Sequence, residues 1–106
     1  MMYFDEISEY FYMLKILNYS FDGPHGITTI FNPVSGIYVI TTLGNTIVDV
    51  GETDNLQERI SSHDRKSCWT RNMGCKLFFY HEARQEQRLE IEKQIRSAYN
   101  PVCGIR

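Results

Sequence analysis

One carboxylate stands at the border of a predicted helical core near the end of the chain. At about 100° per residue, one apolar arc of this helix contains Ile91, Ile95, Ala98 and Tyr99, and Glu92 projects at its edge. A carboxylate there either extends into water or serves as a ligand for a hard metal ion. Because acidic residues often border helical cores, Glu92 alone favours the solvated interpretation.

Two further polar groups lie one turn apart on an earlier predicted helix. Arg59 and His63 are spaced so that they are neighbours, and both project beside the apolar residues Leu56 and Ile60. Their heads therefore emerge next to the stripe that faces the core. Taken alone, the pair favours a surface arginine and a partly packed histidine.

A tyrosine and an aspartate come from two adjacent predicted strands. The runs 37–42 and 46–50 are rich in β-formers and flank a Gly-Asn turn, which predicts a β-hairpin. If the register centres on 43–45, Tyr38 and Asp49 share one face of that hairpin. Tyr38 alone would be interpreted as a core aromatic residue.

The elements that must position these groups give an α+β pattern. In chain order we predict a helix over 5–19, an extended piece over 27–31, the hairpin strands, a helix from Asn55 to His63, a strand over 76–80 and a helix over 83–99. Residues 20–26 and 64–74 are predicted turn and loop. The prediction is therefore one domain over 1–106, with a small antiparallel three-stranded sheet flanked by helices and an extra N-terminal helix.

The distribution of charge along the sequence indicates how the protein could bind nucleic acid. A net charge of −2 argues against a protein that holds nucleic acid by overall charge. Positive charge is concentrated locally, in a segment that contains Arg59, Arg65, Lys66, Arg71 and Lys76. With Trp69 in the same predicted loop, the last four form a candidate nucleic-acid-binding surface, on which bases stack and phosphates meet cations. The alternative is that Trp69 caps a core.

The cysteines and the leader region indicate a compartment. Cys68, Cys75 and Cys103 are odd in number and lack zinc-finger spacing, so we expect a reduced, cytoplasmic protein without structural zinc. The N-terminus does not resemble a signal peptide, and no apolar run is long enough to span a membrane. We therefore expect no membrane association.

The order of these residues resembles the GIY-YIG nuclease module. Gly36-Ile37-Tyr38 is followed after a hairpin by Asp49-Val50-Gly51, and then by Thr53, Leu56, Arg59, His63 and Glu92 ahead of Pro101. The resemblance covers 36–104 and leaves 1–32 as an N-terminal extension. It is specific because several elements occur in order, on the expected strands and helices.

The resemblance implies an enzyme that hydrolyses DNA phosphodiester bonds with one divalent cation, Mg²⁺ or another such as Mn²⁺. Glu92 would be its sole protein ligand, with water and phosphate completing the coordination. Arg59 would contact the scissile phosphate. Tyr38 would help to deprotonate the attacking water, and His63 would hydrogen-bond Tyr38 or share the proton transfer. Gly51 would let strand and helix meet closely.

Two positions depart from the family pattern. Asp49 stands where the second motif normally has tyrosine, and it either becomes a further catalytic metal ligand or repels the phosphate. The closing Pro-x-x-Asn is here Pro101-Val102-Cys103-Gly104. These departures support an alternative, a degenerate module that binds nucleic acid or a protein partner without cutting.

The N-terminal segment suggests a second association. Its aromatic residues exceed what one buried stripe requires, and aromatic residues are enriched at interfaces. Packing of the predicted helix on the sheet and a homodimer interface through that helix are both open interpretations, and a homodimer is compatible with a nuclease.

Overall fold

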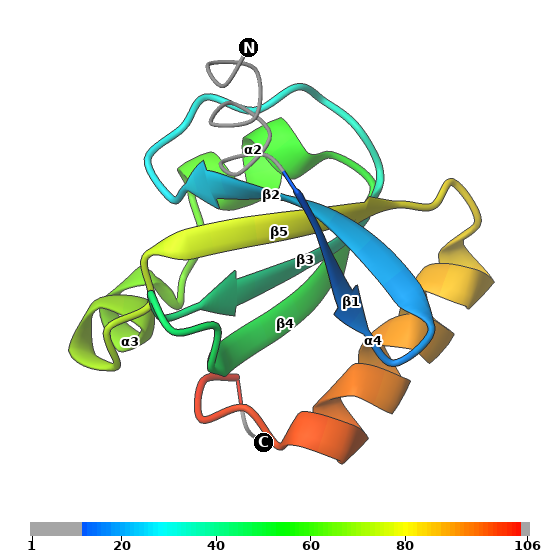
Figure 1. Cartoon of the computed structure of the whole chain (residues 1–106). Coiled ribbons are helices and arrows are strands. Elements are labelled where there is room, and N and C mark those ends of the chain that lie inside the picture. The colour runs from blue at the N-terminus through cyan, green and yellow to red at the C-terminus, as the bar shows by residue number, and fades with distance from the viewer. Residues whose placement is uncertain (1–11, 105–106) are drawn as a thin grey trace, which may run out of the picture.

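The computed structural model describes residues 12–104, which form a five-stranded antiparallel sheet with three helices (Figure 1). The strands are β1 (Tyr12–Ile16), β2 (Tyr19–Gly26), β3 (Gly36–Thr41), β4 (Ile47–Thr53) and β5 (Lys76–His81). Their order across the sheet is β1-β2-β5-β3-β4. The helices are α2 (Leu56–Ser61), α3 (Lys66–Arg71) and α4 (Gln85–Tyr99). The α+β class is confirmed, but the sheet has five strands and not three.

The central strands are buried on both faces of the sheet. One face carries Tyr38, Ile40, Leu77 and Phe79, packed with Leu56, Ile60 and Trp69 from α2 and α3. The opposite face carries Ile37, Val39, Val50 and Phe78, packed with Ile91 and Ile95 from α4. Because successive side chains of a strand point to opposite faces, β3 contributes to both cores. The candidate residues of β3 and α2 therefore meet on the α2/α3 face.

The predicted N-terminal helix is wrong over the described part of its range. Residues 12–16 and 19–26 form the β1–β2 hairpin, and the part of the prediction over 5–11 lies outside the described residues. The apolar positions Leu14 and Ile16, then Tyr19 and Phe21, alternate in each strand and pack on the α4 side of the sheet. The turn between the strands resets this alternation, so the combined pattern imitates helical spacing.

Other boundaries also differ from the prediction. Residues 20–26, predicted as a turn, lie in β2, where the register shifts between Asp22 and His25 and admits Gly23 and Pro24. Residues 27–31, predicted as extended, are turn and irregular structure. The predicted loop 64–74 contains α3, which sequence periodicity missed because Trp69 is its one buried residue.

The structure confirms the predicted hairpin, formed by β3 and β4. It also confirms the predicted helices α2 and α4 and the predicted strand β5. Asn55 caps α2, since its side-chain oxygen accepts a hydrogen bond from the Glu58 N–H at 3.0 Å. The C-terminal helix ends at Asn100, which has φ of 48° and precedes Pro101. Its predicted buried arc is too wide, because Ala98 and Tyr99 are exposed.

A disulfide joins α3 to the C-terminal segment. Cys68 and Cys103 are bonded, whereas Cys75 is free and half-buried. The expectation of fully reduced cysteines is therefore wrong for this pair, whose proximity depends on tertiary packing and cannot be deduced from spacing. No helix in residues 12–104 combines the length and the apolar content that crossing a membrane requires.

The β1–β2 turn provides a test of the revised N-terminal structure. Leu17 follows β1 with φ of 56°, a conformation that glycine adopts without strain and leucine does not. We expect Leu17→Gly to raise the free energy of unfolding by about 1 kcal/mol, measured by urea denaturation. In a helix the same change would lower it by about as much.

A matched control is Ser20→Gly, which changes an exposed residue inside β2. It should lower the free energy of unfolding by about 0.5 kcal/mol, because glycine weakens strand interiors. Destabilisation by Leu17→Gly would contradict the hairpin.

Candidate active site

Three predicted site residues meet at one phenol oxygen. Tyr38 comes from β3 and is fully buried. Its Oη lies 2.5 Å from Nε2 of His63, and it accepts a hydrogen bond from Nε of Arg59 at 3.2 Å. His63, just after α2, and Arg59, on α2, thus come within reach of the same oxygen. The structure brings these three side chains together, and the contact of His63 with Tyr38 is one that the family resemblance implies. The convergence of Glu92 with Tyr38 and Arg59 stays a prediction.

Gly51 makes room for the tyrosine. Tyr38 is paired with Gly51 across β3 and β4, and a Cβ added to Gly51 would overlap the ring and hydroxyl of Tyr38. The sequence-based interpretation of Gly51 as a contact between strand and helix is therefore incomplete. Its small size serves the position of the phenol itself.

The ring of His63 is oriented by the chain on its other side. Its Nδ1 accepts a hydrogen bond from the backbone N–H of Arg65 at 3.0 Å. A neutral imidazole carries one proton, so that proton sits on Nε2, which donates to the Tyr38 oxygen. The ring also packs on Trp69, with centroids 4.5 Å apart. These contacts fix both the orientation and the tautomer of His63.

Burial keeps this histidine neutral. It lowers the pKa of His63 to about 4, and the cations of Arg59 and Arg65 act in the same direction. Nδ1 of His63 lies 3.5 Å from a carboxylate oxygen of Asp64, but at neutral pH this contact joins no opposite charges because the ring is uncharged.

The tyrosine is likewise held in its protonated form. Burial raises the pKa of Tyr38 to about 12, although the nearby Arg59 guanidinium opposes this shift. The phenol oxygen accepts two N–H donors, so its own proton points in a third direction. Once that proton is lost, both donors would stabilise the phenolate.

Asp49 occupies a fully buried position at the centre of a hydrogen-bond network. Its oxygens accept bonds from Nε of Arg65 at 2.8 Å, Nε1 of Trp69 at 2.7 Å, a terminal nitrogen of Arg96 at 3.2 Å and the N–H of Val50 at 2.8 Å. Asp49 shares the sheet face of Tyr38, as predicted, because its partner in β3 is Ile40. A metal ion at Asp49 would have to displace these donors.

Glu92 lies on α4 near the outer edge of the sheet, which β4 forms. Its side chain is 21% exposed, and its carboxylate lies 3.8 Å from Arg96, one helical turn away. Arg96 in turn donates to the Val50 carbonyl and to Asp49. Residues 12–104 contain no group of three or more His, Cys, Asp or Glu side chains placed to hold a metal ion.

Comparison with protein families identifies the context of this site. The GIY-YIG catalytic domain model matches residues 34–105. The chain belongs to the GIY-YIG family. The resemblance found in the sequence is thus confirmed, and the family is one of nucleases. Comparison with curated proteins gave no match.

Within this GIY-YIG domain, the predicted nucleic-acid-binding residues differ in how far their side chains are exposed to water. Trp69 is fully buried, so no surface is left on which a base could stack, and the prediction of a stacking role is wrong. Arg65 is engaged by Asp49. The exposed Arg71 and the half-buried Lys66 face water in part, and Lys76 donates to the Leu43 carbonyl at 3.1 Å.

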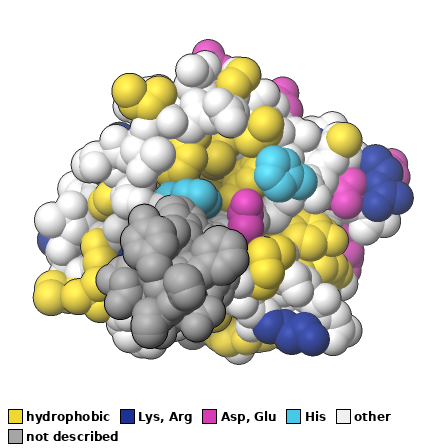
Figure 2. Space-filling model, turned by 45° about the horizontal axis from the view of Figure 1, so that its top comes forward, with side chains coloured by type: hydrophobic (Ala, Val, Ile, Leu, Met, Phe, Trp, Pro, Cys, Tyr) yellow, Lys and Arg dark blue, Asp and Glu magenta, His cyan; other side chains and the backbone are white. Residues whose placement is uncertain are grey.

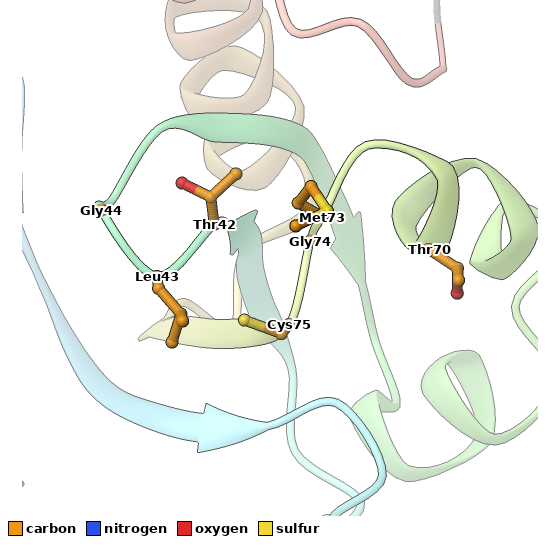
Figure 3. Close-up of a pocket in the computed structure, with 7 residues that line it drawn as sticks. All are labelled: Thr42, Leu43, Gly44, Thr70, Met73, Gly74 and Cys75. Atoms are coloured by element: carbon orange, nitrogen blue, oxygen red, sulfur yellow. The ribbon is translucent and has the colours of Figure 1, made fainter.

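An apolar hollow of about 540 Å³ lies apart from the cluster formed by Tyr38, Arg59 and His63. Figure 3 shows it between the β3–β4 turn, with Leu43, and the connection from α3 to β5, with Met73 and Cys75. None of the predicted site residues lines it. It therefore adds no group to the catalytic chemistry.

Arg96 is the residue that sequence reasoning missed. It connects α4 to β4 through Asp49 and Val50, and to the C-terminal segment through the Cys103 carbonyl at 3.0 Å. A signal was present, since Arg96 follows Glu92 by four residues on the same helix face. Its partners on other elements could not be deduced from that spacing.

Because the pKa of His63 is low in the folded protein, the free energy of unfolding depends on pH. Between about pH 6.5 and pH 4 the unfolded chain binds a proton at His63 that the folded chain does not, so lowering the pH favours unfolding. We expect the free energy of unfolding to fall more steeply from pH 7 to pH 4.5 in the wild type than in His63→Gln.

Urea denaturation at both pH values measures this difference. Comparing the two proteins removes the contributions of carboxylates common to both. Equal losses of stability in wild type and His63→Gln would show that His63 titrates normally in the folded state.

Proposed function

We propose that the protein is a metal-dependent GIY-YIG endonuclease that hydrolyses phosphodiester bonds of DNA. The observation that carries the proposal is the convergence of Arg59 and His63 on the Tyr38 oxygen. A phenol placed between a guanidinium and an N–H donor can act as a base near a phosphate once its proton has left.

Arg59 would bind the scissile phosphate. Its Nε is used by Tyr38, while its side chain remains 35% exposed and lies 3.7 Å from the exposed Asp64 through one terminal nitrogen. A phosphate would compete well for the terminal nitrogens, because the pair with Asp64 is long and solvated. Arg59 would then link the phosphate directly to the tyrosine.

Tyr38 would accept a proton from the attacking water after its own proton has passed to another water molecule, in the direction that the Arg59 and His63 donors leave unused. His63 does not receive that proton, because its Nδ1 is already occupied by the Arg65 N–H and its Nε2 carries hydrogen. His63 instead acts as a positioning residue and as a donor to the phenolate. The water oxygen would then attack phosphorus, the ester P–O bond would break, and the departing oxygen would take up a proton from solvent water.

Glu92 would hold the divalent cation, Mg²⁺ or Mn²⁺, as its sole protein ligand. A carboxylate that is partly exposed, without a surrounding ligand cluster among residues 12–104, fits an ion that takes its other ligands from water and phosphate. Such an ion, when bound, supplies positive charge that lowers the pKa of nearby acids and stabilises the charged phosphate.

The alternative function is a non-catalytic module that binds nucleic acid or a protein partner. It rests on Asp49, which replaces the second tyrosine of the family. However, the charge of Asp49 is paired with Arg65 and Arg96, so it would not repel a phosphate as an unpaired carboxylate would. We propose that Asp49 positions Arg65, and through it His63, and does not bind the metal.

The DNA contacts, the cellular compartment and the oligomeric state are also proposals or predictions. Lys66 and Arg71 are candidates for contacts with DNA. Cytoplasmic residence remains a prediction, and the bond between Cys68 and Cys103 weighs against it because reducing compartments keep most thiols reduced. A homodimer through an N-terminal helix has no support over residues 12–19, which form strands and a turn.

Cleavage of supercoiled plasmid with Mg²⁺ or Mn²⁺ tests the function. We expect the wild type to cut, and Tyr38→Phe and Glu92→Gln each to lose at least about a hundredfold in rate. Each change is close to isosteric, and circular dichroism would verify the fold.

The matched control is Glu86→Gln, on an exposed position of the same helix as Glu92. It should cut at the wild-type rate. A wild type that is inert with both metals, or Glu92→Gln that cuts as fast as wild type, would refute the nuclease proposal.

A further inference from the structure

A small cavity lies beside the candidate active site and is lined by none of the residues of that site. Its volume is about 140 Å³, and its lining includes Asp22 and His25 from β2, Phe79 and His81 from β5, and Phe31 from the connection to β3. Figure 2 shows a face on which two histidines and an acidic side chain border exposed apolar atoms. The cavity thus combines apolar walls with a few polar groups, which is typical of a ligand site.

The cavity and Tyr38 share one face of the sheet. Asp22 pairs with Phe79, and Phe79 pairs with Tyr38, so these side chains form one row across β2, β5 and β3. Two strand spacings of about 4.8 Å place Asp22 roughly 10 Å from Tyr38. A group bound at Asp22 can therefore belong to the same substrate molecule as a phosphate bound near Tyr38.

The walls of the cavity are largely flat rings. His25 meets Phe31 edge to face, with centroids 5.8 Å apart, and His81 meets Phe79 in the same way at 4.8 Å. Phe31 and Phe79 are buried, while His81 is exposed at the mouth. Such walls suit a planar, partly apolar ligand that stacks on aromatic surfaces.

One polar atom in this cavity has no partner. Oδ1 of Asp22 is buried and accepts no hydrogen bond from any group in residues 12–104. A buried acceptor without a donor destabilises the fold. A ligand that brings an N–H group would satisfy it.

From these observations we infer that the cavity binds a nucleobase with an exocyclic amino group, such as cytosine or adenine, from the strand cut at Tyr38. The inference rests on the proposed nuclease function. The amino group donates to Oδ1 of Asp22 while the ring lies among the aromatic walls. Thymine fits less well, because carbonyl oxygens flank its N–H and are repelled by the carboxylate. The base must be unpaired to enter, so the substrate is single-stranded or locally opened at this point.

Equilibrium binding of labelled oligo(dC) and oligo(dT), measured by fluorescence anisotropy in EDTA, tests this inference. We expect the wild type to bind oligo(dC) about tenfold more tightly, since a hydrogen bond to a charged group is gained. Asp22→Leu should abolish the difference and leave the affinity for oligo(dT) unchanged. Its melting temperature should not fall, because the change removes an unpartnered buried acceptor.

The matched control is Asp54→Leu, at an exposed carboxylate outside this cavity's lining, which should keep the preference for oligo(dC). If Asp22→Leu fails to fold, His81→Ala replaces it, since this side chain is exposed. It should weaken oligo(dC) binding several-fold by removing one wall. Equal affinity of the wild type for both strands, a preference that survives in Asp22→Leu, or unchanged oligo(dC) binding by His81→Ala overturns the inference.

The binding assay also separates this inference from the nuclease proposal. Without metal it does not depend on cleavage, so a base preference in a protein that cuts no plasmid would leave the cavity assignment standing. Cleavage without any base preference would remove only the cavity assignment.

Discussion

The rest of the site depends on the hydrogen bonds that the buried carboxylate of Asp49 accepts. It joins β4 to α3 through Trp69, to the residue before α3 through Arg65, and to α4 through Arg96. A buried charge is stabilised only when donors surround it closely, so this network tolerates few arrangements of the elements around it. The backbone of Arg65, positioned by that network, then orients His63, and His63 orients Tyr38. The family's second tyrosine is thus replaced by a group with a structural task.

The same burial that orders the site also keeps its acid–base groups neutral. Desolvation raises the pKa of Tyr38 and lowers that of His63, and the cation of Arg59 only partly offsets the effect on the tyrosine. The resting site therefore contains a phenol and a neutral imidazole. Additional positive charge near Tyr38 would shift its titration toward the phenolate, which provides a physical reason to couple a bound cation to base formation.

The sequence predicts the part of the fold that is encoded locally. The β3–β4 hairpin and α4 follow from periodicity and turn residues, whereas the contact of His63 with Tyr38 was implied by the resemblance to the GIY-YIG module. The β1–β2 hairpin was mistaken for a helix because a turn with Leu17 in a left-handed conformation shifts the alternation. The partners of Asp49, the bond between Cys68 and Cys103, and the burial of Trp69 arise from packing between distant segments. Residue spacing alone contains no information on such contacts.

The family match and the sheet divide the strands into two groups. The match covers 34–105, within which β5, β3 and β4 form the three-stranded sheet that the sequence predicts. Before it in the chain, β1 and β2 extend that sheet from the edge of β5, and β2 brings Asp22 and His25 to the face that holds Tyr38. Residues that position the scissile phosphate and residues that contact its neighbouring base would then come from separate segments. Selectivity could change in β2 without disturbing the bonds of Asp49, because the donors to Asp49 described above belong to Arg65, Trp69, Arg96 and Val50, which lie outside β2.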